Sequence, residues 1–145
     1  MQALLRVLAA GRDVVELGTA FGEGAAALAE TARSVVTVEI DHERAAIARD
    51  RLAGFDNVEA LQGDCYDLLS GRGPFGLVFA DGGAYDWEFI VGLLEPGGIL
   101  VKDDLTPGRE ADGDPVREFL LRDPRLVAAE IPTTPASAAI VAVRR

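Results

Sequence analysis

Residues 14–24 read VVELGTAFGEG, and this stretch decides the fold. The β-branched pair Val14 and Val15 opens a run that ends at Gly18, and an alanine-rich segment that favours a helix begins at Glu23. Glycine permits backbone conformations and close approaches that a Cβ atom would block. The pattern therefore predicts a strand, a glycine-rich turn and a helix. Because ligands of open α/β sheets lie outside the carboxyl ends of the strands, we expect this turn to belong to a binding site.

Segments that favour strands and segments that favour helices alternate along the whole chain. Strands are expected at residues 14–17, 34–40, 57–61, 76–80, 99–102, 126–131 and 138–143. Helices are expected at residues 2–10, 23–32, 41–53, 64–69, 85–94 and 116–121, with Asp41 and Asp64 opening two of them. The alternation predicts an α/β fold: a Rossmann-like, doubly wound, mostly parallel sheet of about seven strands inside a three-layer αβα sandwich. The length predicts a single domain over residues 1–145.

The connections between these elements carry further information. Only about six residues, Pro132 to Ser137, join the last two predicted strands, whereas a parallel crossover needs a dozen or more. We therefore expect the last strand to run antiparallel to its neighbours. Residues 95–98 are expected to be the turn that ends the preceding helix, and the polar segment 103–115 to be a solvated loop at the site.

Composition and charge disfavour several classes of protein. The formal net charge is −10, which disfavours non-specific binding to nucleic acids or to anionic membranes. The only cysteine, Cys65, excludes an internal disulfide and a cysteine-only zinc site. Residues 1–13 lack the basic start of a signal peptide, and no apolar run approaches the ~20 residues that span a bilayer. We therefore expect a cytoplasmic protein with no membrane partner.

The spacing of the glycines argues against a dinucleotide as the ligand. A G-x-G-x-x-G fingerprint beginning at Gly18 would need glycine at positions 20 and 23, which are Ala20 and Glu23. Glu23 would also place a negative charge where a pyrophosphate would sit. A phosphate-binding P-loop is excluded because no Gly-Lys-Ser/Thr follows. An NAD-dependent dehydrogenase remains an alternative supported only by the sheet and by Glu39.

The ligand should instead tolerate carboxylates and carry little phosphate. S-adenosylmethionine has a cationic sulfonium, an ammonium, a carboxylate, a ribose and an adenine. Glu39 ends the second predicted strand, where an acidic residue can accept hydrogen bonds from ribose hydroxyls. Asp64 follows the third strand, where it could meet the edge of the adenine.

Five segments occur in an order that is typical of one family. They are VVELGTAFGEG (14–24), VTVEID (36–41), LQGDCYDLL (61–69), GLVFADGG (76–83) and LLEPGGILVKDD (93–104). In this order the chain resembles the class I S-adenosylmethionine-dependent methyltransferases, and within them the O-methyltransferase branch that includes catechol and caffeoyl-CoA methyltransferases. Each motif alone is weak, but five in order over nearly the whole chain are specific.

The resemblance implies a set of cofactor-binding residues. It places Gly18, Thr19 and Ala20 against the methionine part, Glu39 on the ribose, and Asp64 with Cys65 beside the adenine, while Asp81 lies near the amino group and the reacting centre. The full set that it implies is Glu16, Gly18, Thr19, Ala20, Phe21, Gly22, Gly24, Glu39, Ile40, Asp64, Cys65 and Asp81.

Three aspartates predict a cation site at the same edge. Asp81 ends the fourth strand, and Asp103 and Asp104 end the fifth, so that adjacent parallel strands would bring the three carboxylates together. Hard cations such as Mg²⁺ prefer clustered carboxylate oxygens. Catechol-type relatives use a divalent cation to hold and acidify the substrate hydroxyl. In that family the third ligand is often Asn, and here it is Asp104. Asp81 and Asp104 are therefore the candidate catalytic residues.

The chain departs from the family pattern at two further places. The family's catalytic lysine lies three residues after the first metal-binding aspartate, but this position is Ala84. Lys102 lies in a strand and is expected to face elsewhere, so the general base could be Asp104, the substrate or a metal-bound group. Relatives also carry helices before the first strand, and we expect these to be short or absent here. Three alternatives follow: a minimal version of the fold, a truncated chain, or a homodimer whose partner completes the site.

The function predicted from these features is O-methylation of a small hydroxylated molecule. One alternative is a non-catalytic module that binds the cofactor or a partner protein. Another is a nucleic-acid or other N-methyltransferase, although Asp81-Gly82-Gly83 is not the Asn/Asp-Pro-Pro-aromatic motif of many such enzymes. Tyr85 is expected to border the substrate pocket, and Trp87 to serve mainly in helix packing.

Overall fold

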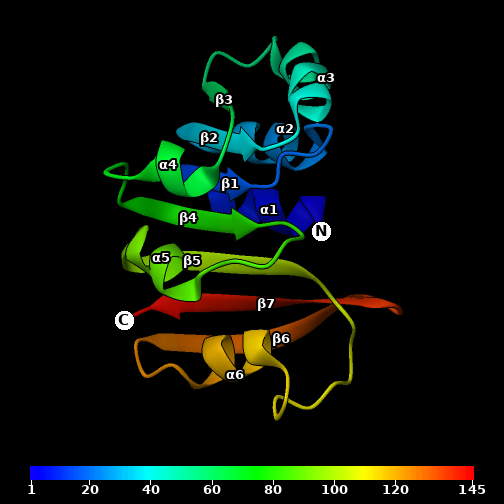
Figure 1. Ribbon diagram of the computed structural model, residues 1–145, viewed down its shortest axis with the longest axis vertical. Coiled ribbons are helices and arrows are strands. Elements are labelled where there is room, and N and C mark those ends of the chain that lie inside the picture. Colours follow the sequence, from blue (N-terminus) through cyan, green and yellow to red (C-terminus); the bar gives the residue numbers. More distant parts are fainter.

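The computed structural model describes all residues 1–145 as a seven-stranded sheet with helices on both of its faces (Figure 1). The strands are β1 (Asp13–Leu17), β2 (Ser34–Glu39), β3 (Val58–Gln62), β4 (Phe75–Ala80), β5 (Leu94–Leu105), β6 (Leu126–Thr134) and β7 (Ser137–Arg144). The helices are α1 (Gln2–Ala9), α2 (Glu23–Ala29), α3 (His42–Leu52), α4 (Cys65–Leu69), α5 (Trp87–Gly92) and α6 (Pro115–Arg122). None of the helices is both long enough and apolar enough to cross a bilayer.

The strand order confirms the predicted fold class. The sheet runs β3-β2-β1-β4-β5-β7-β6, with β1 to β5 parallel and β7 antiparallel to both β5 and β6. The short connection between β6 and β7 closes a hairpin at the pair Thr134 and Ser137, which confirms the reversed last strand. The chain moves outward from β1 to β3 and then returns to β4 on the other side of β1. Such a reversal of strand order leaves a crevice for ligands at the carboxyl ends of β1 and β4.

Each face of the sheet carries its own layer of apolar side chains. On one face, Leu5 of α1 and Leu28 of α2 pack with Val14 and Leu77. On the other face, residues of α4, α5 and α6 pack against the sheet, and Trp87 belongs to this core as predicted. All six residues of β4 are buried, as expected for a central parallel strand that is covered on both faces. The two layers hold the ends of β1 and β4 in fixed positions.

The largest local differences from the sequence-based prediction lie around α5 and β5. The helix expected at 85–94 begins only at Trp87, because the side chain of Asp86 accepts hydrogen bonds from the amides of Glu88 and Phe89 and so caps it. Residues 95–98 were expected to be a turn, but they belong to β5, where the pairing with β4 shifts register. A Cβ atom on Gly98 would lie 2.9 Å from the Phe75 carbonyl oxygen, so this close pairing requires glycine.

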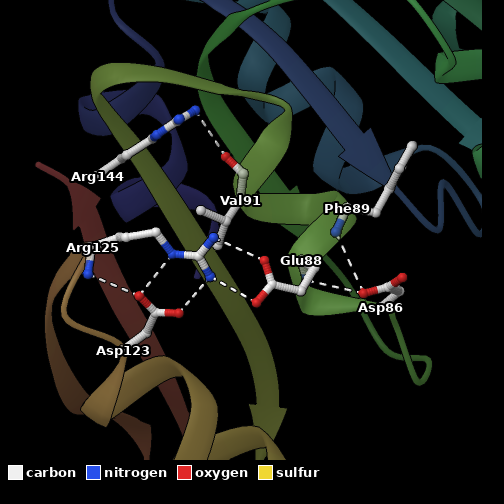
Figure 2. A network of polar contacts seen from close by, with 7 residues as sticks. All are labelled: Asp86, Glu88, Phe89, Val91, Asp123, Arg125 and Arg144. Carbon is white, nitrogen blue, oxygen red and sulfur yellow. Dashed lines mark hydrogen bonds and ion pairs between the residues drawn. The ribbon is translucent and has the colours of Figure 1, made fainter.

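A polar network joins α5 to the hairpin at the far end of the sheet. Figure 2 shows the guanidinium of Arg125 between the carboxylates of Asp123 and Glu88, with nitrogen–oxygen distances of 2.6 to 2.9 Å. Arg144 of β7 donates to the carbonyl oxygen of Val91 at 3.2 Å. Exposed ion pairs contribute about 0–1 kcal/mol each, so this network orients α5 more than it stabilises the fold.

Candidate functional site

The register of the strands brings the predicted site residues to one edge. Leu17 pairs with Val38 of β2 and with Ala80 of β4. The residues that follow these three are Gly18, Glu39 and Asp81. Because the strands are parallel and in register, Gly18 lies between Glu39 and Asp81 at the carboxyl end of the sheet. Ala80 in turn pairs with Lys102, which places Asp103 beside Asp81. The in-register ends of the central strands therefore assemble the site.

The glycine-rich turn packs directly against the end of β4. Gly18 and Gly22 have φ values of 90° and 86°, and Ala20 has the unusual value of 46° for a residue with a Cβ atom. The amides of Gly18 and Thr19 both donate to the carbonyl oxygen of Val38. This tight path requires glycine at position 18 and leaves the backbone of the turn facing the crevice.

The carboxylate of Glu39 is fixed by two backbone amides. One oxygen accepts from the amide of Ala20 at 2.8 Å, and the other accepts from the amide of Asp41 at 3.0 Å. Glu39 is only 6% exposed. Each carboxylate oxygen can accept more than one hydrogen bond, so acceptor capacity remains for a ligand. Glu39 thus joins the ends of β1 and β2 and faces the crevice at the position predicted for a ribose-binding residue.

Two adjoining cavities make up the crevice. The first has a volume of about 260 Å³ and is mostly apolar; it is lined by Leu17, Gly18, Val38, Glu39, Ile40, Gly63, Asp64, Cys65, Tyr66, Gly83, Ala84 and Tyr85. The second, of about 390 Å³, shares Gly18, Glu39, Ile40, Gly83 and Tyr85 with the first and adds Ala20, Arg44, Asp81, Gly82 and Asp104. A continuous groove therefore leads from Asp64 past Glu39 to the carboxylates of Asp81 and Asp104.

Seven of the predicted cofactor-binding residues line this groove: Gly18, Ala20, Glu39, Ile40, Asp64, Cys65 and Asp81. The other five, Glu16, Thr19, Phe21, Gly22 and Gly24, lie outside the lining of both cavities. Gly22 packs against Ala48 of α3, and a Cβ atom on Gly24 would lie 2.2 Å from a carboxyl oxygen of Glu16. Glu16, Gly22 and Gly24 therefore support the turn through packing, whereas Phe21 is exposed on it.

A buried chain of hydrogen bonds holds the turn from below. The hydroxyl of Thr37 donates to Glu16 at 2.5 Å and accepts from the hydroxyl of Thr19 at the same distance. The second carboxyl oxygen of Glu16 is buried without a hydrogen-bond partner. Burial raises the pKa of Glu16 to about 8, against the lowering effect of the Thr37 hydrogen bond. Glu16 is therefore largely protonated at neutral pH, beneath the turn and close to the carboxylates of Asp81 and Glu39.

The three aspartates converge as the sequence predicts. One carboxylate oxygen from each of Asp81, Asp103 and Asp104 lies within 4.8 Å of the others. Burial and the charges of Asp104 and Asp103 raise the pKa of Asp81. One oxygen of Asp103 is buried and has no hydrogen-bond partner, and Asp104 holds a φ of 62°. An unpartnered buried oxygen within a set of three carboxylates fits a hard divalent cation.

The prediction that Lys102 faces elsewhere is wrong. Its ammonium donates to the carbonyl oxygen of Gly82 at 3.0 Å and to that of Asp103 at 2.6 Å. Alternation along β5 puts Lys102 on the same face as Leu100, which packs on the side of α5, and its long stem reaches from there to the turn after β4. Burial lowers the pKa of Lys102, whereas the three nearby carboxylates raise it.

Two tyrosines, Tyr85 and Tyr66, also line the groove, and tertiary packing places them there. The hydroxyl of Tyr85 lies 2.9 Å from the carbonyl oxygens of both Leu17 and Asp81, and burial raises the pKa of this phenol. Tyr66 lines the first cavity and accepts a hydrogen bond from the amide of Asp86. Tyr85 lines both cavities, and its place beside the substrate stays a prediction. The sequence offered no prediction for Tyr66.

The sequence and the fold are similar to those of known methyltransferases. The family model described as "Methyltransferase domain" matches residues 15–105. A curated protein-L-isoaspartate O-methyltransferase from Rhodopseudomonas palustris is 34% identical over 133 residues, which are 84% of this chain and 61% of that protein. One from Nitrobacter winogradskyi is 38% identical over 91 residues, 61% of this chain and 42% of that protein. The chain thus spans less than two thirds of the length of these relatives.

Solved structures with a similar fold include proteins that hold the expected cofactor. Cofactor-bound Rv0187 from MTB has a TM-score of 0.83 at 29% identity, over 99% of this chain and 79% of that one. The O-methyltransferase TomG from Streptomyces achromogenes, in complex with S-adenosylmethionine (SAM), has a TM-score of 0.82 at 26% identity, over 99% and 77%. An O-methyltransferase from Bacillus cereus, in complex with S-adenosylhomocysteine (SAH), has a TM-score of 0.81 at 25% identity, over 99% and 78%. The resemblance stated from the five motifs is confirmed, and the chain belongs to the methyltransferase domain family.

Proposed function

We propose that this protein is a SAM-dependent methyltransferase that transfers the methyl group to an oxygen atom. The observation that carries the proposal is the buried carboxylate of Glu39, which the amides of Ala20 and Asp41 hold at the wall of the groove. A carboxylate fixed in this way is matched to a pair of ribose hydroxyls. The complexes of TomG with SAM and of the Bacillus cereus enzyme with SAH support the choice of cofactor.

The groove suits the separate parts of SAM. The mostly apolar cavity that contains Asp64 and Cys65 would take the adenine, with the Asp64 carboxylate near its edge. The methionine part would follow the turn at Gly18 and Ala20, toward Asp81. In this arrangement Asp104 would face the reacting end of the cofactor, where the second cavity leaves room for an acceptor.

The reaction is an in-line displacement at the methyl carbon. The acceptor oxygen forms the new C–O bond as the C–S bond breaks, the sulfonium becomes the neutral thioether of SAH, and the acceptor loses its proton. The protein's contribution is to align the oxygen with the methyl carbon and to exclude water. Ala84 offers no base at the family's lysine position, so we assign proton removal to Asp104 or to a group of the acceptor itself.

Asp81, Asp103 and Asp104 would hold a divalent cation such as Mg²⁺. These residues fit such an ion, since one oxygen of Asp103 is buried and unpartnered and one carboxylate oxygen from each residue lies close to the others. When bound, the ion would hold the acceptor hydroxyl and lower its pKa.

The acceptor that fits this end of the groove is a small hydroxylated molecule. The curated relatives are named as protein-L-isoaspartate O-methyltransferases, which makes a protein carboxylate the second candidate. A divalent cation bound to these three carboxylates would favour a hydroxyl acceptor, whose pKa it would lower, whereas a carboxylate acceptor is already ionised and gains nothing from this effect. Methyl transfer from labelled SAM to hydroxylated aromatics and to an isoaspartyl peptide, each with and without Mg²⁺, separates the two classes. Transfer to the peptide alone, without any need for Mg²⁺, would contradict the assignment.

The direct test of the proposal is SAH binding measured by calorimetry on the wild type, Glu39→Ala and Glu43→Ala. We expect the wild type to bind SAH in the micromolar range, and Glu39→Ala to bind at least about tenfold more weakly, because losing hydrogen bonds to charged groups costs ~1.5–3 kcal/mol. Glu43 is an exposed carboxylate in the first turn of α3 and is the matched control. No measurable binding by the wild type would overturn the proposal.

A non-catalytic cofactor-binding module is the second candidate, because alanine occupies position 84. This candidate predicts that SAH binds normally and that no acceptor in the panel is methylated. Turnover of any single acceptor would exclude it.

A further inference from the structure

Lys102 stands out in both the sequence and the structure. Of the 14 lysine and arginine residues, it is the only lysine. It is 4% exposed, whereas the other buried basic residue, Arg117, has two carboxylate partners of its own. Lys102 has no such partner within ion-pair distance, and both of its hydrogen bonds go to backbone carbonyl oxygens. A buried cation that is paired only with the backbone suggests a positional role.

We propose that Lys102 is a positioning residue that joins the turn after β4 to the end of β5 and so fixes the acceptor end of the groove. One hydrogen bond reaches the carbonyl oxygen of Gly82, the residue after Asp81, and the other reaches that of Asp103. The bond to Gly82 crosses from β5 to the turn after β4, while the bond to the neighbouring Asp103 fixes the lysine head on its own strand. Together they set the separation between the Asp81 carboxylate after β4 and the pair on β5. The inference rests on the proposed function.

An ammonium suits this position better than a guanidinium. Its compact head carries three donors that can diverge toward separate carbonyl oxygens, whereas the planar fork of arginine is matched to carboxylates. Two of the three donors are used by Gly82 and Asp103, and the positive charge lies among three carboxylates that repel one another. Lys102 therefore reduces the repulsion among the three carboxylates, which would otherwise push the turn after β4 away from the end of β5.

The turn that Lys102 holds is also connected to the cofactor end. The amide of Asp81 donates to the carbonyl oxygen of Leu17 at 3.0 Å. The hydroxyl of Tyr85 lies within hydrogen-bond distance of the carbonyl oxygens of both Leu17 and Asp81. The hydrogen bond of the Asp81 amide lies next to the turn that Lys102 holds, so it should open more often when Lys102 is replaced. The hydrogen bonds of the glycine turn to Val38, and those of Glu39 to Ala20 and Asp41, do not involve Lys102. The glycine turn and Glu39 should therefore keep their geometry, and the effect should be confined to the acceptor end.

The test compares the wild type with Lys102→Met, Lys102→Arg and the exposed control Arg109→Met. The measurements are SAH affinity by calorimetry, Mn²⁺ affinity by electron paramagnetic resonance, and hydrogen exchange of the Asp81 amide by NMR. We expect Lys102→Met to keep SAH affinity within about threefold, to bind Mn²⁺ about tenfold more weakly and to exchange the Asp81 amide faster, since groups that orient metal ligands typically contribute 10–100-fold. Lys102→Arg should recover part of both losses, because it keeps the charge and the donors.

Two results would overturn the inference. The first is a Lys102→Met protein with wild-type exchange at Asp81 and wild-type Mn²⁺ affinity. The second is an equal loss of SAH affinity, which would indicate a general structural role. If the wild type itself does not bind SAH, the proposed function fails, but exchange at Asp81 in the free protein still decides the role of Lys102.

A measurement on the wild type covers the case in which Lys102→Met does not fold. Labelling with ¹⁵N-lysine gives one side-chain signal, because the chain has one lysine. A buried ammonium with two hydrogen bonds should show a slowly exchanging signal that Mn²⁺ broadens. A lysine signal that is lost through fast proton exchange with water, and that Mn²⁺ does not broaden, would contradict the inference.

Discussion

A Cβ atom on Gly18 would lie 2.6 Å from the carbonyl oxygen of Asp81. This distance is shorter than any real Cβ contact, so the turn after β1 and the end of β4 approach each other backbone to backbone. The groove depends on this approach, because Gly18 and Asp81 line it from the ends of the neighbouring strands β1 and β4.

Replacement of Gly18 by alanine should therefore damage both folding and binding. Gly11 also has a positive φ, of 70°, but nothing lies within 4 Å of a Cβ atom placed there. Gly11→Ala should cost ~1 kcal/mol of unfolding free energy from its backbone conformation alone. Gly18→Ala should lose more stability than Gly11→Ala, because its Cβ atom meets a backbone oxygen, and it should also bind SAH more than about tenfold more weakly as its turn shifts away from Asp81. Calorimetry and urea denaturation on both variants check this, and equal SAH affinities would contradict it.

The buried carboxyl of Glu16 should make stability depend on pH. Its pKa in the folded protein is raised to about 8, from an ordinary value of 4.5, so the folded state holds a proton that the unfolded state releases. The stabilising effect of protonation is present below about pH 4.5 and is lost as the pH rises toward 8. Glu16→Gln should remove this dependence and be the more stable protein at pH 8.5, by on the order of 3 kcal/mol. Urea denaturation of the wild type and of Glu16→Gln from pH 5 to 8.5 measures this difference. If the unfolding free energies of the two proteins changed with pH in parallel, the prediction would be wrong.

Mg²⁺ should stabilise the protein through the aspartate cluster. A ligand at 10 times its dissociation constant adds ~1.4 kcal/mol to the unfolding free energy. Asp104→Asn should lose most of this gain, because the three carboxylates share the ion, whereas Asp112→Asn, in an exposed ion pair with Arg122, should keep it. Thermal melts with Mg²⁺ and with EDTA give the comparison. An unchanged melting temperature on adding EDTA to Mg²⁺-loaded wild type would argue against the ion.

Arg117 of α6 should be among the most sensitive positions outside the groove. Its buried guanidinium bonds Glu130 of β6 at 2.7 and 2.9 Å, Asp114 at 2.6 Å and the carbonyl oxygen of Thr106 at 2.7 Å. Removing one partner of a buried ion pair costs ~3–5 kcal/mol, so Arg117→Met should lose this much stability. Arg122→Met, which breaks an exposed pair, should lose less than about 1 kcal/mol by urea denaturation. Similar losses in the two variants would contradict this difference.

Much of the fold was predictable because the local signals agree with one another. The alternation of strands and helices, the aspartate caps of α3 and α4 and the short β6–β7 connection all indicate the same topology. The positions of Glu39 and Asp81 followed from strand ends alone, since parallel strands in register end at one edge.

The parts that sequence could not provide depend on tertiary contacts. The direction of Lys102 depends on which face of β5 meets α5, and the burial of Asp114 depends on Arg117. The prediction that the aspartates of the 103–115 loop are solvated is wrong for Asp114, whose side chain is 18% exposed in a pair with Arg117. Arg44 and Tyr66 reach the groove from neighbouring helices, which no spacing along the chain reveals.

The position of β7 between β5 and β6 has a consequence for the order of assembly during synthesis. β6 pairs with no strand except β7, which leaves the ribosome after it. In a nascent chain that ends at Thr134, β6 would therefore have no partner strand and β5 would be an unpaired edge strand. Both could then form hydrogen bonds with a strand of another molecule. The sheet can close only when the last-made strand inserts between two earlier ones, so this final step, rather than the cofactor end, should be where misfolding begins.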